Sequence, residues 1–417
     1  MSASPRHARD HHPAWPRLDG RLDTDETSLR WAADDFGHLV HRRPRAVLRP
    51  GSVADIAAVL RHCATHDIPV AARAEGHSTG GQAQALDGVV IDLSGLRTVH
   101  EVGADFVSVD AGARWSQVLA ETLPLGLTPP VLTDYLELSV GGTLSVGGLG
   151  GASHHHGAQT DNVLDLTVST PDGELLDCSP TNNAALFNRI RAGRGRHGVI
   201  LRATVRLVPA PTHARRHQLY YTDLAVFLDD QRRLVADGRF DYLEGQLKRD
   251  DRGDRRYLIE ATTFRSRDGG DDVRLDDLRH ERDTAEVEDL TYWDFLNRLA
   301  DGEAHLRSTG EWLHAHPWSN LLLPDSAVET VLTGETARRS VDDVGPSGLV
   351  LLYPIPRQRL TTPMLDLPDG DPVFLFALLR HAATDDHATV RRMQDANRAL
   401  RSQVTANGGT VYLVGPG

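Results

Sequence analysis

Two glycine-rich stretches, residues 73–82 and 133–151, constrain most strongly what this chain can fold into. The second contains six glycines, and a carboxylate, Asp134, lies near its start. A loop with so few Cβ atoms allows backbone N–H groups to close around an anion such as a phosphate. The first stretch follows the apolar run 68–72, so we expect it to leave a β-strand and to place His77 in a glycine-flanked loop. We expect the two stretches to meet in space.

The glycines do not form the fingerprint of a Rossmann dinucleotide site. That site requires a strand, G-x-G-x-x-G, a helix and an acidic residue about 20 positions further on. Here Gly147–Gly151 leads into Ala152, Ser153 and three histidines rather than into an amphipathic helix. We therefore expect a phosphate-bearing cofactor that is held by a different loop geometry.

Length and composition exclude several classes of protein. A chain of 417 residues favours two domains or one large domain. The net charge of −13 argues against a nucleic-acid-binding surface. The N-terminus lacks the apolar segment of a signal peptide, and no run approaches the roughly 20 apolar residues of a membrane span. We expect a soluble, cytoplasmic protein that binds neither nucleic acid nor membrane.

The cysteines and clustered histidines do not predict a metal site. Cys63 and Cys178 are too few for a disulfide framework, and we interpret them as small buried residues. The histidines at 154–156 are adjacent, so they cannot all point at one ion from a regular element, and no acid or cysteine lies at a ligand offset. We predict no bound metal.

The order of apolar and polar runs divides the chain into three parts. Residues 1–39 are interpreted as a tail and lead-in, with regular structure from near Val40. Residues 40–209 mix short strands and helices, as in an α+β domain. Residues 210–417 combine strand-like pieces with long amphipathic helices, which predicts an α+β cap domain with an antiparallel sheet. The densely charged segment 265–289 is interpreted as a solvated loop and helix face.

Two residues could carry chemistry, and composition leaves each of them open. His77 faces a ligand if its glycine-flanked loop is part of the site, and otherwise it is an ordinary loop histidine. Asp134 is either a general base beside the cofactor, with its pKa set by burial and neighbours, or an N-cap or turn aspartate.

A series of motifs runs through both halves of the chain. The motifs of the first half are ARAEGHSTGGQA, TDYLELSVGGTLS, HGAQTDNVLDLTVSTPDGELLDCS and GRHGVILRATVRLVPAP. Those of the second half are FDYLEG, YLIEATTF, YWDFLNRL, HPWSNLLLP, LVLLYPIPR and VYL. In this order they resemble the motifs of the cytokinin dehydrogenases, which belong to the vanillyl-alcohol oxidase (PCMH) type of FAD-linked oxidoreductases. The resemblance implies an α+β protein of two domains, a PCMH-type FAD-binding domain and a substrate cap.

The resemblance also implies a role for particular residues. His77 matches the histidine that is covalently joined to the flavin, and Asp134 matches the catalytic aspartate beside it. Glu244, Trp318 and Asn320 match residues of the substrate pocket. The remaining positions that match FAD contacts are Ala72, Ala74, Glu75, Gly76, Ser78, Gln82, Ser139, Ser145, Leu149, Ile200 and Tyr412. Tyr135 falls about where related oxidases carry a second linking cysteine, so a single covalent bond is expected.

The implied reaction is oxidation of a secondary amine, most simply an N6-substituted adenine. The flavin accepts hydride from the carbon next to nitrogen, Asp134 accepts the amine proton, and the imine product hydrolyses to an amine and an aldehyde. Oxygen or a quinone would reoxidise the flavin. The alternatives are an FAD-linked oxidase of a biosynthetic alcohol or amine, and a non-catalytic flavin-binding relic.

Two departures from the family pattern stand out. Glu75 replaces a small or basic residue, which changes the charge near the flavin. The resemblance also implies a further return of the chain to the FAD domain beyond Tyr412, whereas this sequence ends at Gly417. We therefore expect that another element replaces this return, that the FAD site is more open, or that activity is impaired.

Overall fold

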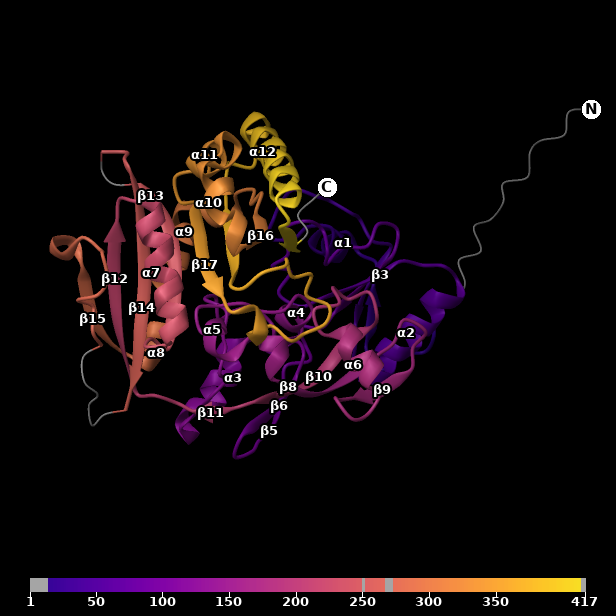
Figure 1. The fold of residues 1–417 in the computed structure, drawn as a ribbon. Helices are drawn as coiled ribbons and strands as arrows, with labels where there is room; N and C mark the ends of the chain where they lie inside the picture. The colour runs from indigo at the N-terminus through magenta and orange to yellow at the C-terminus, as the bar shows by residue number, and fades with distance from the viewer. Residues whose placement is uncertain (1–13, 250–251, 267–272, 414–417) are drawn as a thin grey trace, which may run out of the picture.

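A computed structural model describes residues 14–249, 252–266 and 273–413, and these residues form two lobes (Figure 1). The first lobe contains two small sheets with short helices, and the second contains one large antiparallel sheet with most of its longer helices on one face. The α+β class and the antiparallel sheet of the cap are thus as predicted. The boundary near Pro209 stays a prediction.

The first small sheet has the strand order β1-β2-β4-β3, and its inner strands are parallel. Helix α2 packs its apolar stripe on this sheet. The elements are β1 (Arg21–Asp23), α1 (Glu26–Ala32), β2 (Ala46–Arg49), α2 (Val53–Thr65), β3 (Val70–Arg73) and β4 (Val89–Asp92).

Regular structure begins well before Val40, so our expectation for the lead-in was wrong. Strand β1 pairs with β2, and α1 follows it. Trp15 and Leu18 pack against the core of this sheet, and the carboxylate of Asp55 accepts the backbone N–H of Gly20 at 2.8 Å. These contacts hold the segment on the first sheet, although its polar composition suggested a loose tail. Residues 1–13 lie outside the described residues.

The second sheet is antiparallel with the order β5-β6-β10-β8-β9. Its core also receives residues of α3, α4 and α6. Its elements are β5 (Val99–Val102), β6 (Phe106–Asp110), α3 (Trp115–Thr122), α4 (Val140–Leu144), α5 (Ser153–His156), β8 (Val163–Ser169), β9 (Leu175–Cys178), α6 (Ala184–Ile190) and β10 (Val199–Arg206), while β7 (Leu127–Thr128) and β11 (Val208–Pro209) pair separately. Cys63 and Cys178 are buried and free, and burial raises the pKa of both thiols to about 11.

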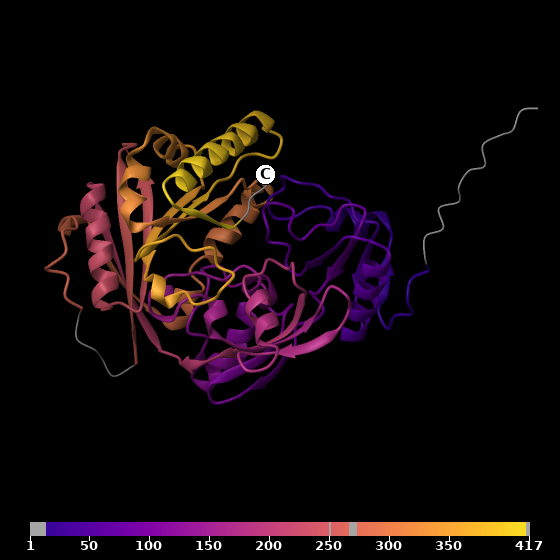
Figure 2. The same cartoon turned by 45° about the vertical axis from the view of Figure 1, so that its right-hand side comes forward.

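The sheet of the second lobe has eight strands in the order β15-β12-β14-β13-β17-β18-β16-β19. The strands are β12 (His213–Tyr221), β13 (Tyr242–Arg249), β14 (Arg255–Arg265), β15 (Glu286–Thr291), β16 (Ser319–Pro324), β17 (Leu349–Ile355), β18 (Val373–Leu379) and β19 (Thr410–Leu413). The helices are α7 (Leu224–Asp237), α8 (Tyr292–Leu296), α9 (Ala300–Thr309), α10 (Asp325–Thr333), α11 (Glu335–Asp342) and α12 (His387–Ala406). Strand β19 lies where the two lobes meet (Figures 1 and 2).

Both faces of the central strands are buried, and the alternation of side chains decides which partner each residue meets. On β17, Val350 and Leu352 pack with α7, α10 and α12, while Leu351 and Tyr353 pack on the opposite face with Leu149 of the first lobe. The same rule turns Tyr242 and Glu244 of β13 toward the first lobe, because Leu243 between them packs under the helices. The face of β13 toward the first lobe therefore carries a hydroxyl and a carboxyl group, while that of β17 is largely apolar.

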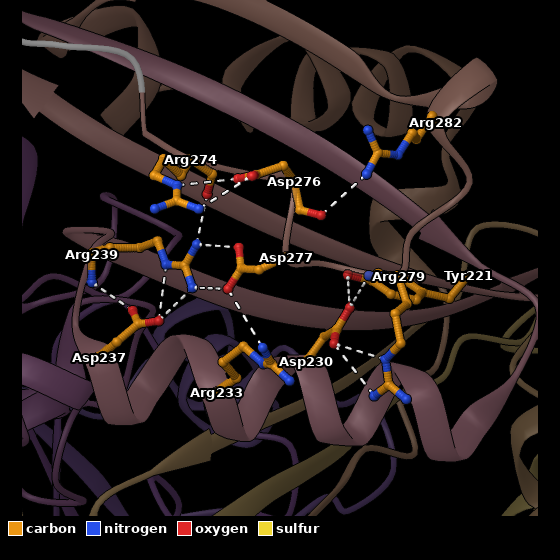
Figure 3. A network of polar contacts seen from close by, with 10 residues as sticks. All are labelled: Tyr221, Asp230, Arg233, Asp237, Arg239, Arg274, Asp276, Asp277, Arg279 and Arg282. Atoms are coloured by element: carbon orange, nitrogen blue, oxygen red, sulfur yellow. Dashed lines mark hydrogen bonds and ion pairs between the residues drawn. The ribbon is translucent and has the colours of Figure 1, made fainter.

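The described part of the charged segment 265–289 is largely exposed, as expected of a solvated loop, but its helical part is a short 3-10 helix (Arg282–Thr284) and it ends in a strand. Strand β15 pairs with β12 at the edge of the sheet. Before it, the segment is fastened to α7 by ion pairs (Figure 3). Arg239 contacts Asp277 at 2.7 Å, and the buried Asp230 accepts from the backbone N–H of Arg279 at 2.7 Å. The acidic pair at 271–272 lies outside the described residues.

Gly151 allows the two lobes to approach closely. Its carbonyl oxygen accepts the backbone N–H of Leu243 at 3.0 Å, and a Cβ atom at Gly151 would lie 2.5 Å from the ring of Tyr242. We expect Gly151→Ala to destabilise the protein by about 1–3 kcal/mol, the usual cost of overpacking. Gly95→Ala is the control, because no atom lies within 4 Å of the added carbon. Equal urea midpoints for the two variants would contradict this packing role.

Candidate functional site

The two glycine-rich stretches meet, as the sequence predicts. Arg114 at the start of α3 joins them: its guanidinium binds Glu75 at 2.9 Å and Glu137 at 2.8 Å. The rings of His77 and Tyr135 lie 5.1 Å apart. The charge of Glu75, which we expected to alter the flavin environment, is therefore paired with an arginine of the same lobe.

The glycine run itself does not form the anion-binding nest that we expected. The backbone N–H of Gly148 donates to the hydroxyl of Tyr412 at 3.0 Å, and that of Gly150 donates to Oγ of Ser153 at 3.1 Å. Because protein acceptors already engage these groups, they are not directed at a phosphate. The glycines instead permit close packing of the chain at the contact between the lobes.

The loop that follows β3 has the properties expected of the nest. The backbone N–H groups of residues 75–78 donate to no acceptor within the described residues. Gly76 has φ +66°, a left-handed conformation that favours glycine and turns successive N–H groups toward one side. A run of free N–H groups beside His77 fits the anionic part of FAD.

His77 lies in a box of aromatic rings. Phe36 stacks on its imidazole at 4.0 Å, and the rings of Trp318 and Trp312 lie 5.9 and 6.1 Å away. Within the described residues neither ring nitrogen of His77 has a hydrogen-bond partner. Desolvation, followed by the nearby His316, lowers the pKa of His77 to about 3, so the imidazole is neutral at physiological pH. A cavity of about 760 Å³ adjoins this box.

Asp134 occupies the junction of the two lobes. Its Oδ1 accepts from the hydroxyl of Tyr242 at 2.6 Å and from Nη2 of Arg298 at 2.8 Å. Arg298 follows α8 and also binds Glu260 of β14, with Nε at 3.3 Å from Oε1. Asp134 lines a cavity of about 290 Å³ between the segment 134–137 and α9. This carboxylate is therefore held by partners from the other lobe and borders space for a ligand.

Glu244 and Glu260 lie directly opposite each other on the neighbouring strands β13 and β14. Two charged carboxylates in this position would repel each other. Burial, followed by the charge of Asp134, raises the pKa of Glu244 well above its usual range. Burial and the neighbouring carboxylate thus favour the protonated form of Glu244, while the guanidinium of Arg298 contacts Glu260.

The other residues that match FAD or substrate contacts lie in several parts of the structure. Leu149 packs with Tyr412 in one apolar cluster, and the carbonyl of Ser145 accepts the backbone N–H of Arg194, whose side chain binds the carbonyl of Tyr412. Asn320 is buried on β16 beside β19. The remaining positions are Ala72 and Gln82, which are exposed, Ile200, which lies in the core of the first lobe, Ser139, which precedes α4, and Ala74, which packs near the first sheet.

Sequence reasoning missed Tyr242, Glu260, Arg298 and Phe36. Tyr242 carries a signal, since it precedes Glu244 by two positions on a strand and must share its face. Arg298 has no such signal, because its contact with Asp134 joins residues 164 positions apart. Phe36 was hidden in the segment that we interpreted as a lead-in.

The clustered histidines make hydrogen bonds to the backbone. The ring nitrogens of His154 lie 2.7 and 2.9 Å from the carbonyl oxygens of Gly151 and Phe240. Elsewhere in the described chain, potential ligand atoms of Glu311, His314 and His381 lie within 4.8 Å of one another.

The second histidine cluster has an explanation that needs no ion. The backbone N–H of Ser347 donates to Nε2 of His381 at 2.7 Å. The proton of a neutral His381 therefore resides on Nδ1, where it is donated to Nδ1 of His314 at 3.2 Å. A hydrogen-bonded histidine pair accounts for this geometry.

Comparison with known proteins shows the family of the chain. An FAD binding domain matches residues 44–179, and the FAD and cytokinin binding domain of cytokinin dehydrogenase 1 matches residues 256–413. Cytokinin dehydrogenase 10 of Oryza sativa subsp. japonica is 36% identical, with 94% of this chain and 80% of the relative covered. Cytokinin dehydrogenase 3 of Arabidopsis thaliana is 35% identical, with 88% and 78% covered. The chain belongs to the cytokinin dehydrogenase family.

A bacterial relative is similar over still more of its length. An oxidoreductase from the fasciation locus of Rhodococcoides fascians, described as uncharacterized, is 43% identical over 95% of this chain and 90% of the relative. The protein is an FAD-dependent oxidoreductase of the PCMH type. Within the part of the chain that the structure describes, no helix is long and apolar enough to cross a bilayer.

The raised pKa of Glu244 predicts a pH-dependent stability. A carboxyl group whose pKa is higher in the folded chain than in the unfolded chain, where it is about 4.3, stabilises the fold fully only below the unfolded value. That contribution falls by about 1.4 kcal/mol per pH unit until the pH passes the folded pKa. We expect Glu244→Gln to gain stability relative to the wild type from pH 5 upward, in urea unfolding. The exposed Glu329 of α10 gives a control, Glu329→Gln. A stability difference between Glu244→Gln and the wild type that does not change with pH would contradict the raised pKa of Glu244.

Proposed function

We propose that this protein oxidises the C–N bond of a secondary amine, with an N6-substituted adenine as the substrate class. The observation that carries the proposal is the position of Asp134, whose carboxylate is fixed by Arg298 and Tyr242 beside a cavity of about 290 Å³. Tyr135, the next residue, lies against His77, so a flavin bound at His77 would adjoin this carboxylate. A fixed carboxylate in that position would have the properties of a general base. The printed names of the plant relatives support cytokinins, which are substituted adenines, as the substrate class.

The free backbone N–H groups of residues 75–78 are proposed to bind FAD, and the side chain of His77 is proposed to form a covalent bond with it. When bound, FAD accepts a hydride and passes the electrons to oxygen or to a quinone-like acceptor. Trp318 borders the His77 box and Asn320 lies on the face of β16 toward the first lobe, so both are proposed to bound the substrate space.

Asp134 is proposed to take the proton from the amine nitrogen as the neighbouring carbon gives up its hydride. Removal of this proton prevents a full positive charge on nitrogen. The guanidinium of Arg298 stabilises negative charge on Asp134 before the reaction, and the hydroxyl of Tyr242 fixes the orientation of the same oxygen. The neutral carboxyl of Glu244 lies in the same group and is able to donate a hydrogen bond.

We expect Asp134→Asn to bind FAD normally and to lose the proton acceptor. In anaerobic mixing with an N6-alkyl adenine, the bleaching of the flavin by substrate should slow by about 10²-fold or more, the usual scale for a general base. Asp325→Asn is the matched control, because it removes an aspartate that pairs with Arg232 on the helix-covered side of the sheet. Equal bleaching rates for Asp134→Asn and the wild type would refute the role of Asp134.

A further inference from the structure

Phe36 lies between two imidazole rings. Its ring is nearly parallel to that of His77, at 4.0 Å and 19°, and nearly parallel to that of His316, at 4.0 Å and 16°. Two rings that both stack at this distance must occupy opposite faces of Phe36. The stack therefore joins three segments that are far apart in sequence: the segment after α1, the loop after β3 and the segment before β16.

The backbone around Phe36 fixes this stack on both sides. The N–H of Phe36 donates to the carbonyl of Gly76 at 2.9 Å, and the N–H of Gly37 donates to that of Ser78 at 3.1 Å. On the other side, Nδ1 of His316 donates to the carbonyl of Phe36 at 2.8 Å, which places the proton of this ring on Nδ1. The loop that carries His77 is thus held in register with the segment 36–37.

Asp35 adds a third attachment. Its buried carboxylate accepts from Oγ of Ser78 at 2.9 Å and from the backbone N–H of Gly81 at 2.7 Å. These bonds fix the loop at positions on either side of His77 without engaging the imidazole. Residues 35–37 lie before the region that matches the FAD binding domain, which begins at residue 44.

We propose that Phe36 is the positioning residue for the covalent bond between His77 and FAD. The inference rests on the attachment at His77 that is part of the proposed function. Since neither ring nitrogen of His77 has a hydrogen-bond partner among the described residues, stacking on Phe36 is what restricts the plane of the imidazole. A neutral ring in a fixed plane presents a lone pair to the flavin and needs no rearrangement before it reacts.

The attachment step balances with oxygen as the oxidant. A ring nitrogen of His77 forms a bond to a carbon of the flavin ring system, and the carbon and the nitrogen each release one proton. The two electrons of the broken C–H bond remain on the flavin until molecular oxygen takes them and is reduced to hydrogen peroxide. Phe36 takes no part in the transfer and acts only through the orientation of His77.

The test compares full-length Phe36→Leu and Phe36→Tyr with the wild type and with His77→Ala. Leucine is apolar but has no ring to stack, whereas tyrosine keeps the ring that stacks on His77. The measurements are total FAD from the visible spectrum and the fraction of FAD that stays with acid-precipitated protein. A melting curve checks that each variant is folded.

In the wild type and in Phe36→Tyr, all FAD should stay with the pellet. In Phe36→Leu, total FAD should be close to normal while attachment slows by about 10²-fold, the scale for a misplaced reacting group, so that acid releases most of the flavin. Full retention in folded Phe36→Leu would overturn the inference. So would a loss of total FAD with the remainder still attached, because this is the result of a merely structural role.

Two further results keep the inference testable. If Phe36→Leu does not fold, Phe36→Met, which is also apolar and has no ring, takes its place, and full retention of flavin in that folded variant overturns the proposal. Release of FAD from the wild type by acid refutes the bond at His77 itself, and with it any role of Phe36 in forming it. Retention in the wild type that is lost only in His77→Ala establishes the bond but overturns the role of Phe36.

Discussion

The ion pairs of Arg298 are the interaction on which the site depends. This guanidinium is largely shielded from solvent between Asp134 of the first lobe and Glu260 of the second, and it packs over the rings of Tyr242 and Phe295. Loss of one partner of a buried ion pair typically costs about 3–5 kcal/mol, because the other partner is left charged and unpaired. The orientation of Asp134 and the contact between the lobes therefore depend on the same side chain.

The protonation state of Glu244 follows from this arrangement. Arg298 provides one positive charge beside three acidic side chains, and the two on β13 and β14 face each other directly. The electrostatic cost is lowest when Glu244 keeps its proton, which is the direction that burial and Asp134 impose on its pKa. A neutral acid and a carboxylate thus share one space, and each is suited to a different role toward a ligand.

Sequence patterns predicted the elements whose signals are local. The α+β class, the antiparallel cap, the loop position of His77 and its approach to the second stretch all follow from short-range periodicity and glycine spacing. Glycine content was a poor guide to a nest in the second stretch, because it does not reveal whether backbone N–H groups already have protein acceptors, as those of Gly148 and Gly150 do.

Residues 14–39 show the limit of composition as a guide. They are polar and rich in arginine and aspartate, yet they add a strand to the first sheet and place Phe36 beside His77. The role of Arg298 could not be predicted from the sequence for another reason. Its partners lie on different lobes, and only the packing of the large sheet against the first lobe brings them together.

The central claim is that Asp134 accepts a proton from the nitrogen whose neighbouring carbon is oxidised. The most direct measurement is anaerobic bleaching of the holoenzyme by an N6-alkyl adenine and by the matching N6,N6-dialkyl adenine, which has no proton on that nitrogen. Competition against the first compound would report whether the second binds. We predict that the secondary amine bleaches the flavin and that the bound tertiary amine does not. Bleaching by both compounds at similar rates would contradict the claim.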